Sequence, residues 1–226
     1  MRLDKFIANN TSFSRKESNK IIRKEQVLVN NKIIIDAAYQ IDAQNDIIKI
    51  NNLVISHKEF IYLVLNKPKD YICSSSNKEG ESVLNLIEQN NWKNLHIVGR
   101  LDKDTKGLIL ITNDGQFTHK IKSNKYHVEK EYEVVLEKEF TNLMFQELEK
   151  DIFLDGKKLK PFQILNINKN KLNIILIEGK YHQIKRIFKI VKNPVIELKR
   201  IRIGKIRLQD LNLNEGEYKE IDPNKL

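Results

Sequence analysis

The sequence predicts an α+β fold in two parts, a small N-terminal α/β module and a larger unit built on a mixed, mainly antiparallel sheet. Strand-like segments outnumber helical ones and mostly follow one another through short turns. No glycine-rich phosphate loop or dinucleotide fingerprint marks a parallel, doubly wound sheet. A polar stretch at residues 51–59 separates the two parts, which we place at residues 1–55 and 60–226.

Two short helices are expected at the start of the N-terminal module. Leu3, Phe6 and Ile7 have helical spacing. Residues 14–17 have the form of a capping box, which predicts a second helix that ends near Lys24.

Three short strands are expected after these helices. Residues 27–29 and 33–35 alternate with period two around an Asn-Asn pair at 30–31, which predicts a tight hairpin. Residues 46–50 predict a third strand.

The second helix has a cationic face. Four basic residues recur on it: Lys16, Lys20, Arg23 and Lys24. This face suits a phosphate backbone, and it is equally typical of an ordinary solvated lysine surface. The formal net charge of +10 over 226 residues favours a polyanionic partner, with nucleic acid as the leading candidate.

Apolar runs predict the strands of the larger unit, and helical periodicity predicts two helices. The expected strands lie at residues 62–65, 108–112, 132–136, 172–177 and 195–198. The first of them ends at the Asn-Lys-Pro sequence 66–68, because proline cannot continue a central ladder. One helix is expected at 142–149 after a Thr141 cap, and a second, amphipathic helix follows Gly179 within 178–191.

Residues 99–115, GRLDKDTKGLILITNDG, carry the strongest functional pattern in the chain. Asp102 lies between a glycine turn and an apolar strand, with Arg100 before it and Thr105 after it. A lone aspartate in such a turn is typically a cap or an Asx turn, but the length of this polar pattern favours chemistry. A phosphotransferase pattern based on Asp102 and Asp104 is set aside, because Thr105 falls one position too early.

Three segments resemble the pseudouridine synthases of the RsuA/RluB/E/F type. Residues 99–108 match their Gly-Arg-Leu-Asp and Thr-x-Gly-Leu signature, and residues 130–132 match their Lys-x-Tyr element. Residues 179–186 match their Gly-[Arg/Lys]-Tyr-His-Gln-Val-Lys-Arg motif, with Ile184 in place of valine. The opening MRLDKF resembles an S4 RNA-binding domain. The resemblance is nearly end to end, including Lys160-Pro161 and residues 216–218, and is nearest to the RsuA branch.

This resemblance implies an enzyme that isomerises one uridine of ribosomal RNA, of the 16S species, to pseudouridine without a cofactor. Asp102 is then the nucleophile, Lys185 its ion-pair partner, and Tyr132 the residue that stacks on uracil and removes the C5 proton. The implied substrate contacts are Arg100, Leu101, Thr105, His182 and Arg186. The expected RNA contacts of the N-terminal module are Arg2, Lys5, Arg15, Lys16, Lys20, Arg23 and Lys24.

Two alternatives remain open. One is a large-subunit (23S) synthase of the RluB/E/F branch, and the other is a catalytically silent RNA-binding protein of ribosome assembly. The combination of Asp102, Tyr132 and Lys185 favours an enzyme, although a tyrosine at the start of a strand is by itself more typical of packing. The expected partner is ribosomal RNA or a subunit assembly intermediate, and the expected state is a monomer.

Composition excludes several other classes of protein. The single cysteine, Cys73, allows no intramolecular disulfide, and the five histidines lack the spacing of metal ligands. No apolar run approaches a membrane span, and the N-terminus lacks the apolar core of a signal peptide. We therefore expect a cytoplasmic protein without a metal or a membrane partner.

Overall fold

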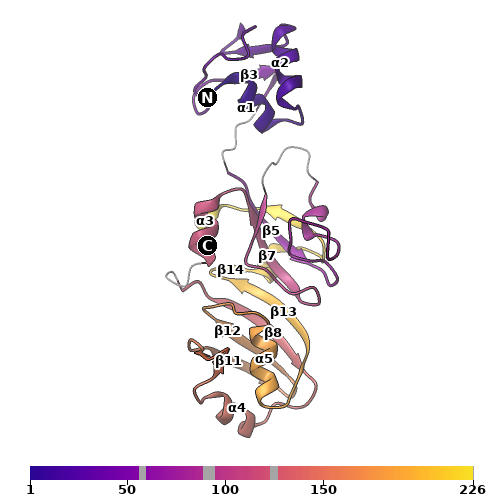
Figure 1. Cartoon of the computed structure of the whole chain (residues 1–226), viewed down its shortest axis with the longest axis vertical. Helices are drawn as coiled ribbons and strands as arrows, with labels where there is room; N and C mark the ends of the chain where they lie inside the picture. Colours follow the sequence, from indigo (N-terminus) through magenta and orange to yellow (C-terminus); the bar gives the residue numbers. More distant parts are fainter. Residues whose placement is uncertain (56–59, 89–94, 123–126, 226) are drawn as a thin grey trace. The chain divides into compact units, whose positions relative to one another are not determined.

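The structure is a computed structural model that describes residues 1–55, 60–88, 95–122 and 127–225. These residues fall into two compact units (Figure 1). The first consists chiefly of residues 1–61, and the second of residues 62–87 and 96–225.

The N-terminal unit contains two helices and a four-stranded antiparallel sheet of order β2-β1-β3-β4. Its elements are α1 (Leu3–Asn10), α2 (Arg15–Arg23), β1 (Val27–Val29), β2 (Lys32–Ile33), β3 (Ile48–Ile50) and β4 (Leu53–Val54). The predicted capping box is present at the start of α2. The Ser14 hydroxyl accepts from the Glu17 N–H, and the Glu17 carboxylate accepts from the Ser14 N–H at 2.7 Å.

The hairpin prediction for this unit is confirmed in its turn and is wrong in the extent of its strands. Asn30 and Asn31 have φ values of 49° and 65°, as a two-residue hairpin turn requires. However, the second strand ends at Ile33, and Ile35 is exposed instead of lying on a buried face. A second Asn-Asn turn, at residues 51–52, leads into β4, which the polar character of this stretch concealed.

The second unit is built on one large mixed sheet, whose main path runs β11-β12-β8-β13-β7-β5-β15. Two further strands join this path, β6 beside β7 and β14 beside β13. The strands are β5 (Tyr62–Lys67), β6 (His96–Val98), β7 (Lys106–Thr112), β8 (Lys130–Leu136), β11 (Gln163–Asn168), β12 (Lys171–Leu176), β13 (Val195–Ile203), β14 (Ile206–Arg207) and β15 (Tyr218–Glu220). Among the described pairings of this sheet, only that of β7 with β13 is parallel. The predicted α+β class with a mainly antiparallel sheet is therefore confirmed.

Three α-helices and a small hairpin accompany this sheet in the described residues. They are α3 (Gly115–Lys122), α4 (Asn142–Leu148), α5 (Gln183–Ile190) and the hairpin of β9 (Phe153–Leu154) with β10 (Lys157–Lys158). The predicted helices α4 and α5 are present, and the Thr141 hydroxyl caps α4 as expected. Helix α3 was not predicted. Asp114 caps it by accepting from the N–H groups of Gln116 and Phe117, so the expected turn leads directly into a helix.

The core of the second unit explains why the run 108–111 is apolar throughout. β7 is buried on both faces, since all four residues of this run are at most 1% exposed. Leu108 and Leu110 pack with Val64 and Val98. Helix α5 lies against β13 and buries Ile184, Ile187 and Phe188, the apolar stripe predicted from their spacing (Figure 1).

The described part of the chain shows neither a metal-binding cluster nor a membrane-spanning helix. No group of three or more His, Cys, Asp or Glu side chains is placed to hold a metal ion. No helix combines the length and the apolar character needed to cross a bilayer.

The parallel pairing of β7 with β13 requires a glycine at position 107. Gly107 pairs with Arg200, and a Cβ atom at Gly107 would lie 2.3 Å from the Arg200 carbonyl oxygen. The φ angle of Gly107 is also +102°, a conformation that side chains disfavour. The two strands approach each other closely because no side chain intervenes.

We predict that Gly107→Ala lowers the free energy of unfolding by roughly 2–5 kcal/mol, because it combines a backbone clash with an unfavourable φ. Thermal unfolding of the full chain measures the effect. Gly115→Ala is the matched control, since Gly115 begins α3 and a Cβ atom there meets nothing within 4 Å. Equal stability of both variants would contradict the close approach of β7 and β13.

Candidate active site

Asp102 lies on the loop between β6 and β7 and faces the start of helix α5. Its Oδ2 atom is 3.1 Å from Lys185 Nζ, and its Oδ1 atom is 3.6 Å from His182 Nε2. The carboxylate is partly exposed. The structure therefore brings together three residues that the sequence analysis selected from two distant segments.

Lys185 is shared between two carboxylates. Its Nζ atom also donates to Asp104 Oδ1 at 2.6 Å and to Oδ2 at 2.9 Å. Burial lowers the pKa of Lys185, but the hydrogen bonds to Asp104 and Asp102 outweigh burial and raise this pKa overall. Asp104 was not among the predicted site residues, although its position two residues after Asp102 was visible in the sequence.

A buried lysine, Lys67, binds the backbone of the loop that carries Asp102. Lys67, at the end of β5, is 0% exposed, and its ammonium donates to the carbonyls of Pro68, Lys103 and Thr105 at 2.9, 3.1 and 2.8 Å. Burial lowers the pKa of Lys67. All three ammonium protons have backbone acceptors, so this side chain fixes the two ends of the turn that follows Asp102. In the sequence, Lys67 marked only the expected end of a strand.

Arg200, on β13, connects this loop to the predicted tyrosine. Arg200 is 1% exposed, and its guanidinium donates from Nε to the Leu108 carbonyl at 2.7 Å and from Nη2 to the Gly99 carbonyl at 2.9 Å. Its Nη1 atom lies 3.5 Å from the hydroxyl of Tyr132, which is itself buried. Among the described contacts, the link between Tyr132 and the Asp102 loop runs through Arg200. No signal in the sequence singled out this arginine.

Lys130 stands two residues before Tyr132 on β8, so both side chains lie on one face of the strand. Burial and the nearby charge of Arg200 lower the pKa of Lys130 to about 8. Its Nζ atom donates to the Val128 carbonyl at 3.0 Å. Two positive groups, one of them an amine with a lowered pKa, therefore share the face of the sheet that carries Tyr132, and perturbed amines are typical of functional sites.

The other predicted substrate contacts have different surroundings. Arg100 is exposed, whereas Leu101 is buried and its N–H donates to the Cys73 sulfur at 3.3 Å. Thr105 is 1% exposed, and its hydroxyl has no hydrogen-bond partner among the described residues. Arg186 forms a bidentate ion pair with Asp155 on the β9–β10 turn, at 2.7 and 2.9 Å. Of these five residues, Leu101 and Thr105 are buried and Arg186 is held in an ion pair. Arg100 and His182 are the two whose side chains are accessible to a substrate.

The predicted RNA contacts of the N-terminal unit divide into two groups. Arg2 and Arg15 both contact the buried carboxylate of Asp4, at 2.9 and 3.3 Å. The hydrogen bond from Arg2, supported by Arg15, holds the pKa of Asp4 well below its usual range. The remaining five lie exposed on α1 and on or next to α2: Lys5, Lys16, Lys20, Arg23 and Lys24.

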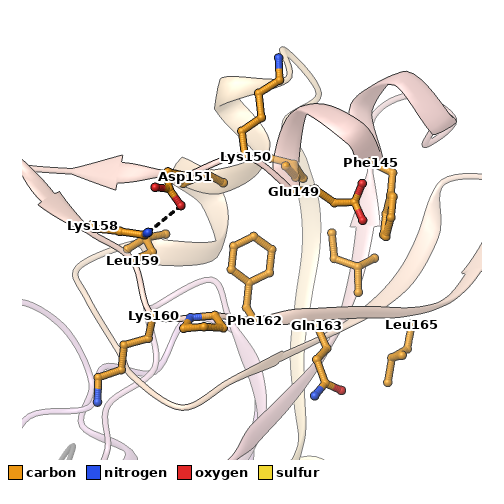
Figure 2. Close-up of a pocket in the computed structure, with 14 residues that line it drawn as sticks. Phe145, Glu149, Lys150, Asp151, Lys158, Leu159, Lys160, Phe162, Gln163 and Leu165 are labelled. Carbon is orange, nitrogen blue, oxygen red and sulfur yellow. Dashed lines mark ion pairs between the residues drawn. The ribbon is translucent and has the colours of Figure 1, made fainter.

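A cavity of about 580 Å³ lies elsewhere in this unit, between α4, the β9–β10 hairpin and the start of β11. Figure 2 shows Phe145, Phe162 and Leu165 around it, with the ion pair of Asp151 and Lys158 at one side. Asp102, Asp104, His182 and Lys185 are not among the residues that line it. Its wall is joined to the turn that precedes α5, because the Lys160 N–H donates to the buried carboxylate of Glu178.

Comparison with known families assigns both parts of the chain. The RNA pseudouridylate synthase family model matches residues 61–189, and the S4 domain model matches residues 1–48.

Individual relatives match over nearly the whole length. The ribosomal small subunit pseudouridine synthase A of Escherichia coli (strain K12) is 38% identical over 224 residues, covering 98% of this chain and 96% of that protein. The protein of the same name from Haemophilus influenzae is 36% identical, with the same coverage. A crystal structure described as a pseudouridylate synthase superposes with a TM-score of 0.68 at 35% identity, covering 100% of this chain and 97% of that one.

Asp102, Tyr132 and Lys185 all lie within the region matched by the synthase family. The chain therefore belongs to the RNA pseudouridylate synthase family and carries an S4 domain at its N-terminal end.

Proposed function

We propose that this chain isomerises one uridine of small-subunit ribosomal RNA to pseudouridine, with Asp102 as the nucleophile. The observation that carries the proposal is the 3.1 Å ion pair between Asp102 and Lys185. The loop that carries Asp102 is itself fixed by hydrogen bonds from the buried side chains of Lys67 and Arg200. The relatives named as small-subunit synthases support the choice of RNA. We also propose that residues 1–55 form the RNA-gripping module and residues 60–226 the catalytic domain.

The isomerisation requires three changes at the nucleotide. The N1–C1′ bond breaks, the uracil turns within its pocket, and C5 bonds to C1′. The C5 proton then leaves and N1 gains a proton, so there is no net redox change and no reductant is consumed. The Asp102 carboxylate initiates this sequence by attack on C1′ of the sugar or on C6 of the base.

Lys185 and Tyr132 have separate roles in this proposal. Lys185 holds the Asp102 carboxylate in position and compensates its charge while the nucleotide displaces water. Tyr132 stacks on the uracil and takes the C5 proton at the end, with its hydroxyl near the Arg200 guanidinium. Arg100, exposed beside Asp102, supports the extruded base or fills the position that it vacates.

We predict that Asp102→Asn abolishes pseudouridine formation, because a neutral amide cannot act as the nucleophile. The test is complementation of cells that lack this gene with wild type or with the variant, followed by pseudouridine mapping in both ribosomal RNAs. Wild type should restore one site in the small-subunit RNA and the variant none. A restored site in the large-subunit RNA would overturn the choice of substrate, and full activity of Asp102→Asn would overturn the nucleophile. If wild type restored no site in either RNA, the chain would be a silent RNA-binding protein.

We predict that Lys185→Met lowers kcat by roughly a hundredfold, a typical effect of removing one charge-stabilising donor, with a much smaller change in RNA affinity. Single-turnover rates and equilibrium binding separate the two quantities. Asp104→Asn is the matched control, because it removes the second partner of Lys185 and leaves the contact with Asp102. Weakened binding without a slower reaction would make Lys185 an ordinary phosphate contact.

We predict that replacing Lys16, Lys20 and Arg23 together by Gln weakens binding to target and non-target RNA alike. Each lost phosphate contact should reduce the slope of log affinity against log salt by roughly 0.7 to 0.9. Turnover at saturating RNA should persist, because these residues lie in the N-terminal unit. An unchanged affinity and salt slope would identify this face of α2 as a solvated surface.

A further inference from the structure

We propose that Tyr181 and His182 form a two-ring platform on which a nucleobase adjacent to the target uridine stacks. This inference rests on the proposed function and adds a positioning role for a residue outside the predicted site. The two rings are stacked, with their centroids 3.8 Å apart and their planes 19° apart. Tyr181 is 73% exposed, so its ring is largely open to solvent although it rests on His182.

Buried hydrogen bonds hold the segment that presents these rings. The Glu178 carboxylate accepts from the Gln183 side chain at 3.0 Å, and the Gln183 side-chain oxygen accepts from the Lys180 N–H at 2.8 Å. Both side chains are less than 10% exposed. This pair closes the turn around Tyr181, which leaves the tyrosine as the projecting residue. The aromatic surface is therefore preorganised, and binding a base costs little additional ordering.

The platform adjoins the reacting atoms. His182 Nε2 lies 3.6 Å from Asp102 Oδ1, and the Tyr181 ring is stacked on that imidazole. His182 has a left-handed backbone conformation, with φ of 49°, which is uncommon for a residue other than glycine. This conformation precedes α5 directly, so the same turn places both the platform and Lys185 beside Asp102.

The charges around the platform favour nucleic acid over an apolar ligand. Lys180 donates to the Lys157 carbonyl at 3.2 Å, which brings its ammonium to a hairpin whose Lys157 and Lys158 side chains are exposed. Lys158 pairs with Asp151 at 2.7 Å, so the cation that adjoins the Tyr181 ring along the chain is Lys180. An exposed ring beside a cation is a usual arrangement for binding single-stranded RNA, in which bases stack and phosphates meet positive charge. A nucleotide next to an extruded uridine has lost one stacking neighbour, and the Tyr181 ring can replace that neighbour.

The kinetic test compares Tyr181→Ala, Tyr181→Phe and wild type on an unmodified transcript of the small-subunit ribosomal RNA. Loss of the ring should raise KM about ten- to a hundredfold and act mainly on KM, as expected for removal of one stacked base. Tyr181→Phe should restore KM, because stacking requires the ring and not the hydroxyl. Leu143→Ala, at a 77% exposed position on α4, is the matched control and should leave KM unchanged.

A double-mutant cycle then identifies the stacked base. An abasic nucleotide is placed on either side of the mapped uridine in a synthetic RNA fragment. At one of the two positions it should raise KM for wild type and have no further effect on Tyr181→Ala.

The outcomes separate this inference from the proposed function. An unchanged KM in Tyr181→Ala, a loss confined to kcat, or additive effects at both abasic positions would overturn the platform while wild type remains active. Absence of turnover by wild type would overturn the proposed function itself.

Discussion

Two buried cations, Lys67 and Arg200, determine the shape of the Asp102 loop. Neither forms its strongest contacts with a carboxylate. Their donors satisfy backbone carbonyls instead, on both sides of Asp102 and at the start of β7. Backbone carbonyls cannot rotate away as side chains do, so each bond constrains the path of the chain directly. Leaving one of these buried donors unpaired would cost more free energy than its hydrogen bond contributes to stability. The loop therefore stays in the conformation that pairs all of them.

This constraint fixes the backbone that carries Asp102, and a second constraint fixes the residues that contact its carboxylate. The side chains that contact Asp102, namely Lys185 and His182, both come from the turn and first residues of α5. That segment has its own internal support, in the pair of Glu178 and Gln183. The site is thus the meeting of two independently braced segments, which need no bound RNA to hold their geometry. Preorganisation of this kind reduces the ordering that must accompany substrate binding.

The sequence predicted those parts of the molecule whose signals are local. The capping box of α2, the Asn-Asn turn, the apolar run of β7 and the stripe of α5 all depend on residues within one turn or strand. The local pattern of residues 99–115 singled out Asp102, and family resemblance added Lys185 as its partner, which the structure places 3.1 Å away. Arg200 and Lys67 were missed because their partners lie up to about a hundred residues away, with no local pattern to announce them. Arg186 was selected from its motif, but the motif did not indicate that this residue pairs with Asp155.

Both the correct fold and the geometry of the candidate active site depend on the parallel register of β7 and β13. Successive residues of a strand face opposite sides of the sheet, so a slip of β13 by one position would turn the Arg200 side chain away from Leu108 and Tyr132. The same slip would move α5, which immediately precedes β13, relative to Asp102. A misregistered molecule could keep its helices and most of its sheet and still lack a site. Catalytic competence is therefore a sensitive report of correct strand alignment, and selection for activity acts at the same time against this class of misfolded state.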